Sequence, residues 1–257
     1  MRLELGGHPL HTRALTVVLR AEAGGLTASA DLVDLRQRGF TPVGSAVQGA
    51  GIIHQMGLDV RLAAGGRTIE AVAARQPVVA FEASPGTLGE SCRDVVPRLA
   101  RLRGAALDDP AALRAAMAGA AGCSHLLAAG QFLCATLTGE PLPAAAPDEV
   151  VHRQVRRRDL VFQGHELADG RLAIGIQLGD LHTAPAPAGE RPMARFRRHD
   201  ELRVRLVLAG WPATIVAAGS PPFRAAAASS TACCTVASPS CRCQPWKARP
   251  SYSISRA

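Results

Sequence analysis

One ordered set of short motifs occurs twice in this chain, and the repetition restricts its fold more than any other feature. The order is a glycine-containing turn, Leu-x-Asp-Leu or a close variant, a His, x-Val-Arg-Leu, Thr-Ile and a Pro. The first copy spans residues 24–77 and the second spans residues 169–221, with Asp34 and Asp180 at matching points. The sequence therefore predicts two copies of one β-meander, related by a pseudo-two-fold axis.

Within the first copy, β-branched and alternating apolar residues predict strands, because such residues suit a pleated surface that is buried on one side. Glycine pairs at Gly24-Gly25 and Gly65-Gly66 predict the tight turns between these strands. The expected strands are residues 13–20, 26–35, 52–62 and 68–74.

After about residue 85 the apolar spacing changes from two to the helical three or four. It predicts one helix over 92–102, a second that begins at Pro110 with Asp109 as its N-cap, and a third over about 123–138. The predicted fold class is therefore α+β, with helices inserted after the first of two β-meander units.

Four segments are expected. Residues 1–140 hold the first β unit and the helices, residues 141–156 form a Pro-, Ala- and Arg-rich linker, and residues 157–223 hold the second β unit. Residues 224–257 read as a disordered tail, because no Asp or Glu follows Glu201 and four of the seven Cys fall there. This break in composition suggests that the natural reading frame is lost near residues 210–228. A thiol-rich metal tail is the alternative interpretation.

The composition excludes several functions. No apolar run is long enough to cross a membrane, and no secretory signal is recognisable at the start, so we expect a cytoplasmic protein with reduced thiols. The net charge is +8, but Lys247 is the only Lys and aromatic residues make up 4% of the chain, which argues against a nucleic-acid surface. The arginines at 153 and 156–158 are interpreted as a solvated part of the linker.

The sequence Gly122-Cys123-Ser124-His125-Leu126 places a thiol and an imidazole two residues apart at the start of the third predicted helix. Unpaired backbone N–H groups and the positive end of the helix dipole lie there, and both favour the thiolate, which is the nucleophilic and metal-binding form. The alternative is that Cys123 only fills space in the core, as many buried cysteines do.

Several motifs in order resemble the bacterial domain of unknown function 2889 family. They are Arg13, Leu-Val-Asp-Leu at 32–35, Ile-His-Gln-Met at 53–56, Pro77, Cys92 and Gly-Cys-Ser-His-Leu at 122–126. The likeness is closest over residues 10–140, and Ser124 stands where the family motif usually has Thr. The family carries no established activity, so the resemblance implies a set of motif residues and no reaction.

Four of the motif residues can do chemistry: His54, Cys92, Cys123 and His125. They could bind zinc or iron, since two His and two Cys suit a tetrahedral site. They could equally form a metal-free centre, with Cys123 as the nucleophile and His125 or His54 as its base.

Asp34 and Asp180 are candidates for orienting a histidine or binding substrate, with strand-end turn residues as the plainer interpretation. We expect an enzyme of small-molecule metabolism. A non-catalytic module that binds a small ligand or acts as a scaffold, with a structural Cys/His cluster, is the alternative. Substrate, reaction and oligomeric state are not predicted.

Overall fold

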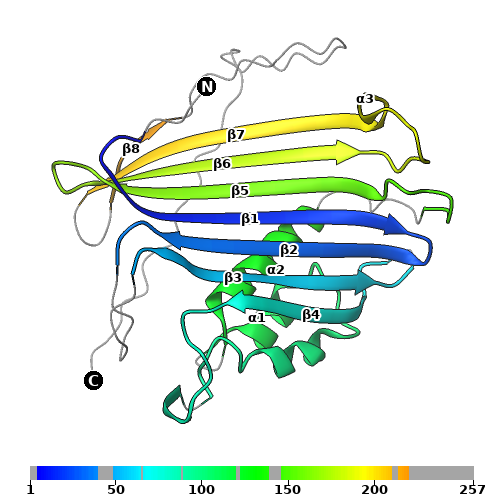
Figure 1. The fold of residues 1–257 in the computed structure, drawn as a ribbon, viewed down its shortest axis with the longest axis horizontal. Coiled ribbons are helices and arrows are strands. Elements are labelled where there is room, and N and C mark those ends of the chain that lie inside the picture. Colours follow the sequence, from blue (N-terminus) through cyan, green and yellow to red (C-terminus); the bar gives the residue numbers. More distant parts are fainter. Residues whose placement is uncertain are drawn as a thin grey trace. The chain divides into compact units, whose positions relative to one another are not determined.

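Eight strands form one antiparallel sheet in the order β4-β3-β2-β1-β5-β6-β7-β8 (Figure 1). The computed structural model describes residues 5–39, 49–64, 66–87, 89–119, 122–138, 146–209 and 214–219. The strands are β1 (His8–Glu22), β2 (Gly25–Arg36), β3 (Gly51–Leu62), β4 (Ile69–Val78), β5 (Gln154–Glu166), β6 (Leu172–Thr183), β7 (Phe196–Ala209) and β8 (Thr214–Gly219). The predicted α+β class is thus confirmed as one antiparallel sheet with a few helices, while the duplication stays a prediction.

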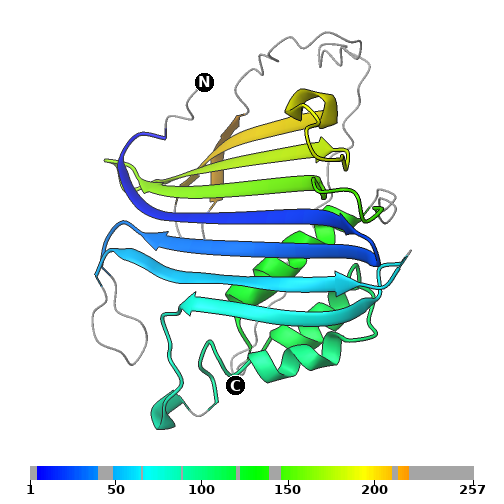
Figure 2. The same cartoon turned by 45° about the vertical axis from the view of Figure 1, so that its right-hand side comes forward.

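Helices follow β4 and cover one face of the sheet on the side of β1–β4, as Figures 1 and 2 show. They are two 3-10 helices, η1 (Pro85–Thr87) and η2 (Val96–Leu102), and two α-helices, α1 (Pro110–Met117) and α2 (Ser124–Leu137). Helix α2 packs on β1, β2 and β3, and η2 packs on β4 and α1. A short helix, α3 (Pro192–Arg195), precedes β7.

The period-two pattern of the strands produces this layer. Alternate residues of β2 from Leu26 to Asp34 are buried, and odd-numbered residues of β1 from Leu15 to Ala21 are buried beside them. Most of these side chains belong to one core cluster with the apolar residues of α1 and α2. Gly130 lets the two helices meet, because a Cβ there would lie 2.8 Å from the Met117 Cε atom.

Two sequence predictions need correction. The helix expected over 92–102 is a 3-10 helix from Val96, because Pro97 lacks the N–H that a longer α-helix would need at that point. Residues 154–156 of the expected linker belong to β5, and Arg156 is buried and not solvated, because Asp180 on the neighbouring strand neutralises it. By contrast, α1 begins at Pro110 with Asp109 as its N-cap, as predicted.

The chain divides into two units, residues 1–221 and 222–257, and every described residue belongs to the first. The predictions of a disordered tail and a Cys-rich metal tail concern residues 224–257, which lie outside the described residues, as do residues 141–145 of the predicted linker. The loss of the reading frame near residues 210–228 stays a prediction. Within the described part of the chain, no helix has the length and apolar character to cross a membrane.

Candidate functional site

A carboxylate in the interior organises the candidate site. Asp34 lies on β2 between Arg13 of β1 and His54 of β3, its direct cross-strand neighbours. It occupies the inward-facing register of Leu32, so the strand directs its side chain under the start of α2. Asp34 is completely buried, and it is not the strand-end turn residue of the plainer interpretation.

Three cationic or imidazole groups surround this carboxylate. His11 Nε2 hydrogen-bonds to Oδ1, while Arg13 Nη2 at 2.7 Å and His125 Nε2 at 2.8 Å hydrogen-bond to Oδ2. Burial alone raises the pKa of a carboxyl group, but the hydrogen bonds from His125, Arg13 and His11 hold the pKa of Asp34 well below its ordinary value. Asp34 is therefore ionised at neutral pH.

Two cysteines lie beside the histidines. Cys123 is the N-cap of α2, and its Sγ contacts the Met56 Sδ atom at 3.8 Å. A hydrogen bond from Cys92 lowers the pKa of Cys123 to about 4, against the effect of burial, and His125 and the backbone N–H of Leu126 add to the lowering. The same contact with Cys123 and burial raise the pKa of Cys92. The two shifts have opposite directions, so Cys92 keeps its proton at a pH at which Cys123 can lose its own.

His125 interacts with both Cys123 and Asp34. Burial lowers the pKa of an imidazole, but the hydrogen bonds with Asp34 and Cys123 outweigh burial and raise the pKa of His125. These shifts favour a thiolate at Cys123 and an imidazolium at His125, next to the ionised Asp34. A nucleophile beside a base that a carboxylate orients is the arrangement used in nucleophilic catalysis.

His54 differs from His125, although the two rings stack at 3.8 Å with an angle of 26°. Burial, and then the charge of His125, lower the pKa of His54 to about 4, so His54 is neutral. Its Nε2 lies 3.6 Å from the Cys92 Sγ atom. The His54 Nδ1 atom is buried without a hydrogen-bond partner among the described residues, 4.0 Å from the Asp34 Oδ2 atom.

The four predicted site residues on the first meander and its helices therefore come together. His54 stacks on His125 and contacts Cys92, both histidines lie beside Asp34, and Cys123 is near enough to Cys92 and His125 for each to shift its pKa. As a metal site the arrangement differs from the predicted one. Among the described residues, a group of candidate ligand atoms within 4.8 Å of one another is formed by Asp34, His54 and His125, without the two thiols.

Asp180 lies apart from this cluster. The register connects Asp34 through Arg13 and Phe162 to Ile176, which is four residues from Asp180 on β6. Three strand spacings and four residues put the two carboxylates roughly 19 Å apart. Asp180 is paired with Arg156 Nη2 at 2.6 Å and Arg158 Nε at 3.2 Å.

The sequence reasoning missed His11 altogether, and it noted Arg13 only as a family motif. The available signal was the alternation of side chains along a strand. Both residues are an even number of positions from Leu15 and Val17, so both point to the buried face. That signal becomes usable only once β1 and β2 are placed in register, with Arg13 opposite Asp34.

Residues 11–137 match the family described as "Protein of unknown function (DUF2889)". The resemblance to this family is confirmed over that range. No curated protein and no solved structure matches the chain. The segment that matches this DUF2889 family contains His11, Arg13, Asp34, His54, Cys92, Cys123 and His125, so every residue of the Asp34 cluster lies within it, whereas Asp180 does not.

Proposed function

We propose that the protein is a cysteine-dependent enzyme that transfers acyl groups from a small-molecule substrate, with Cys123 as nucleophile, His125 as acid and base, and Asp34 as the group that orients His125. The observation that carries the proposal is the row Cys123–His125–Asp34. Its His125–Asp34 link is a 2.8 Å hydrogen bond, and its sulfur lies at the start of α2. A cytoplasmic location would keep both thiols reduced, as this chemistry needs.

The reaction would proceed in two steps. The Cys123 thiolate forms a bond to the carbonyl carbon of the substrate while the π electrons move to the carbonyl oxygen. When this intermediate collapses, the bond to the leaving group breaks, and the leaving group takes the proton of His125. A water molecule then gives a proton to His125 as its oxygen bonds to the thioester carbon, and the C–S bond breaks to release an acid and the thiolate.

The exposed side of the cluster indicates the direction of approach. Cys123 is 4% exposed, while the side chains of Arg13, His11 and His125 are 29%, 16% and 15% exposed. A substrate would therefore enter past Arg13, whose guanidinium group favours an acyl compound that carries a carboxylate or phosphate.

A divalent metal ion is the second candidate, and the unpaired His54 Nδ1 atom favours it. With the His54 proton on Nε2, toward Cys92, the buried Nδ1 lone pair would face an ionised carboxylate oxygen, an arrangement that a cation between them would stabilise. Asp34, His54 and His125 would hold the ion, and two imidazoles with one carboxylate suit zinc or iron. Such an ion would activate a bound water or polarise a carbonyl group. Arg13, which contacts both Asp34 and His125, would have to move aside.

Thiol labelling and metal analysis of the full chain test these candidates together. The rate at which iodoacetamide modifies Cys123, measured by mass spectrometry from pH 4 to 10, should rise well below the pH at which Cys134 reacts. Cys134 is a matched internal control, because it is a buried thiol whose pKa is raised by burial. Asp34→Asn should move the Cys123 profile toward that of Cys134, and Cys123→Ser should abolish thioester hydrolysis.

A Cys123 profile that coincides with the profile of Cys134 would refute the nucleophile proposal. Zinc or iron at one equivalent in the purified protein, lost in His54→Ala but kept in Cys123→Ser, would support the metal candidate instead. Less than a tenth of an equivalent, with unchanged labelling after chelation, would eliminate it.

We also infer that the two halves of the sheet arose by duplication and that only the first half kept a reactive centre. Arg13 pairs with Asp34, as Arg158 pairs with Asp180. At the centre, Leu15 lies opposite Leu160, where a two-fold axis of this register would pass. In the second half Arg156 takes the place of His11, so Asp180 is neutralised by permanent cations that cannot exchange protons.

A further inference from the structure

A pocket lies at the far end of β1 from Asp34. Arg20, seven residues beyond Arg13, is about 23 Å from it along the strand and contributes to the pocket wall. Arg20 is exposed, while its neighbours Leu19 and Ala21 are buried in the core, so the pocket opens on the sheet face opposite the helices. Its volume of about 560 Å³ is within the range of small-molecule sites.

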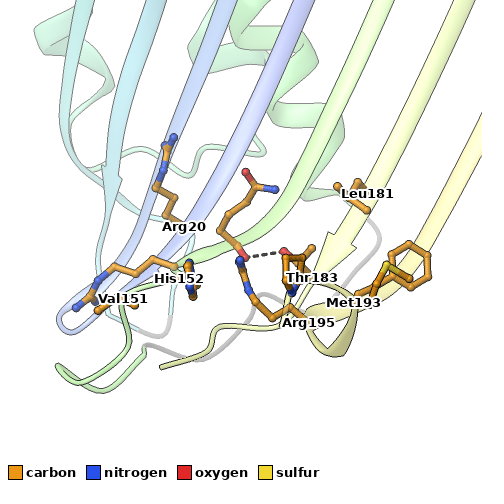
Figure 3. Close-up of a pocket in the computed structure, with 11 residues that line it drawn as sticks. Arg20, Val151, His152, Leu181, Thr183, Met193 and Arg195 are labelled. Atoms are coloured by element: carbon orange, nitrogen blue, oxygen red, sulfur yellow. Dashed lines mark hydrogen bonds between the residues drawn. The ribbon is translucent and has the colours of Figure 1, made fainter. Parts of the chain in front are cut away.

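The walls of the pocket are fixed by hydrogen bonds between segments. The Thr183 hydroxyl on β6 donates to the Gln154 carbonyl oxygen on β5 at 2.6 Å, as Figure 3 shows. At the rim, His152, which precedes β5, forms an antiparallel bridge with Ala186, which follows β6. The pocket is therefore preformed, and binding needs little ordering of the backbone.

The charge of the lining is positive. Arg20, Arg153 and Arg195 line the pocket, and no Asp or Glu is among the lining residues. Arg153 is paired with Glu22 at 3.4 Å. The other two contact neutral oxygens: Arg20 Nη1 lies 3.4 Å from the Ser29 hydroxyl, and Arg195 Nε lies 3.4 Å from the Ala184 carbonyl. Two guanidinium charges beside the pocket thus have no carboxylate partner among the described residues.

Large apolar side chains also line the pocket, beside the polar His152, Gln154 and Thr183. Val151, Met193 and Phe196 line the pocket while 57%, 73% and 36% exposed, and all three are among the most exposed large apolar residues of the described chain. Apolar surface left in water beside a cavity marks a binding site. Figure 3 places Met193 on one side of the pocket, and Arg20 and Val151 on the other.

We propose that this pocket binds a small amphipathic anion, a molecule with an apolar chain or ring and a terminal carboxylate or phosphate. The anionic group would pair with Arg20 and Arg195, whose planar guanidinium groups match these oxyanions in geometry. The apolar part would cover Val151, Met193 and Phe196. This site is separate from the Asp34 cluster, and its occupancy does not depend on the reaction proposed there.

Isothermal titration calorimetry of the full chain tests the proposal with four probes: octanoate, octyl phosphate, octyl glucoside and inorganic phosphate. At least one of the two octyl anions should bind, and the better one identifies the headgroup. Octyl glucoside and inorganic phosphate should each bind at least tenfold more weakly, because one lacks the charge and the other the apolar part. Arg195→Gln and Met193→Ser should each weaken the better anion by about tenfold. Met193 is exposed, Arg195 is half-buried, and neither belongs to the hydrophobic core, so these variants keep the fold.

The matched control is Arg101→Gln, which removes the same charge from an exposed position outside the pocket. It should leave binding unchanged, as should Cys123→Ser, which separates this proposal from the enzymatic one. Equal binding of octyl glucoside and octanoate, equal losses in Arg195→Gln and Arg101→Gln, or no heat from either anion would overturn the proposal.

Discussion

Replacing the two buried aspartates by asparagine separates what stabilises the sheet from what activates the thiol. Asp34→Asn removes a charge that Arg13 and His125 contact at 2.7 and 2.8 Å. It also points an amide donor at groups that are themselves donors. Breaking a buried ion pair on one side costs about 3–5 kcal/mol, and we expect a loss in that range from the free energy of unfolding at pH 7.

Asp180→Asn is the matched variant. It leaves Arg156 and Arg158 without their carboxylate, and Arg156 is buried, so a loss of about 3 kcal/mol is expected here too. Urea unfolding followed by circular dichroism measures both losses. Iodoacetamide labelling then discriminates between the variants: Cys123 should lose its reactivity at low pH in Asp34→Asn and keep it in Asp180→Asn.

The effect of Asp34→Asn also depends on pH with a defined sign. Because the pKa of Asp34 is lower in the folded than in the unfolded chain, its contribution is complete above the unfolded pKa of 3.8 and is lost as pH falls toward the folded value. The difference in stability between the wild type and Asp34→Asn should therefore grow as pH falls from 8 to 6, where the raised pKa of His125 adds to it, and shrink below pH 4. A difference under about 1 kcal/mol at pH 7, or equal labelling of Cys123 in the two variants, would refute the reasoning.

Three further changes have definite expected results. Gly122→Ala places a Cβ against the Met117 carbonyl oxygen, so it should destabilise the fold by about 1–3 kcal/mol and shift the labelling profile of Cys123. Its control, Gly119→Ala, has open space around the new Cβ but a φ of +87°, so it should cost about 1–2 kcal/mol and leave labelling unchanged. Leu133→Ala removes a fully buried side chain of α2 and should cost about 2–5 kcal/mol in urea unfolding; a loss under 1 kcal/mol would contradict the packing described. His54 has a pKa of about 4 against an ordinary 6.5, so the folded chain resists its protonation. The free energy of unfolding should therefore fall as pH drops from 6.5 to 4, by up to about 3 kcal/mol more than in His54→Gln. Parallel pH profiles of stability in the two proteins would count against a buried neutral ring.

Much of the secondary structure is predictable from local patterns. The strand expected over 26–35 is observed as Gly25–Arg36, and the strand over 52–62 as Gly51–Leu62, because period-two burial and glycine turns are properties of neighbouring residues. The arrangement of the strands in one sheet is not a local property. β1 pairs with β5 across more than a hundred residues, and no short motif specifies that contact.

The candidate site likewise contains residues that local patterns predict and residues that only the strand register reveals. Cys123 and His125 stand out because they lie two residues apart at a predicted helix start. Asp34 stands out because Asp180 occupies the matching position in the second copy of the motifs. His11 and Arg13 have no such signal, since their role depends on the register that sets Arg13 opposite Asp34. Arg156 was misread as part of a solvated linker for the same reason, because its partner Asp180 lies on the next strand of the sheet.

The segment that matches the family lacks one of the two strands that flank β1 in the folded sheet. The DUF2889 match ends at residue 137, but β5, one of the two neighbours of β1, begins at Gln154. A fragment cut at the limits of the match would keep β1 from His11 to Glu22 and expose it as an open edge, and an open edge of that length recruits another strand. Such a fragment should associate through β1, and the second copy would then occupy the place that β5 fills in the intact chain.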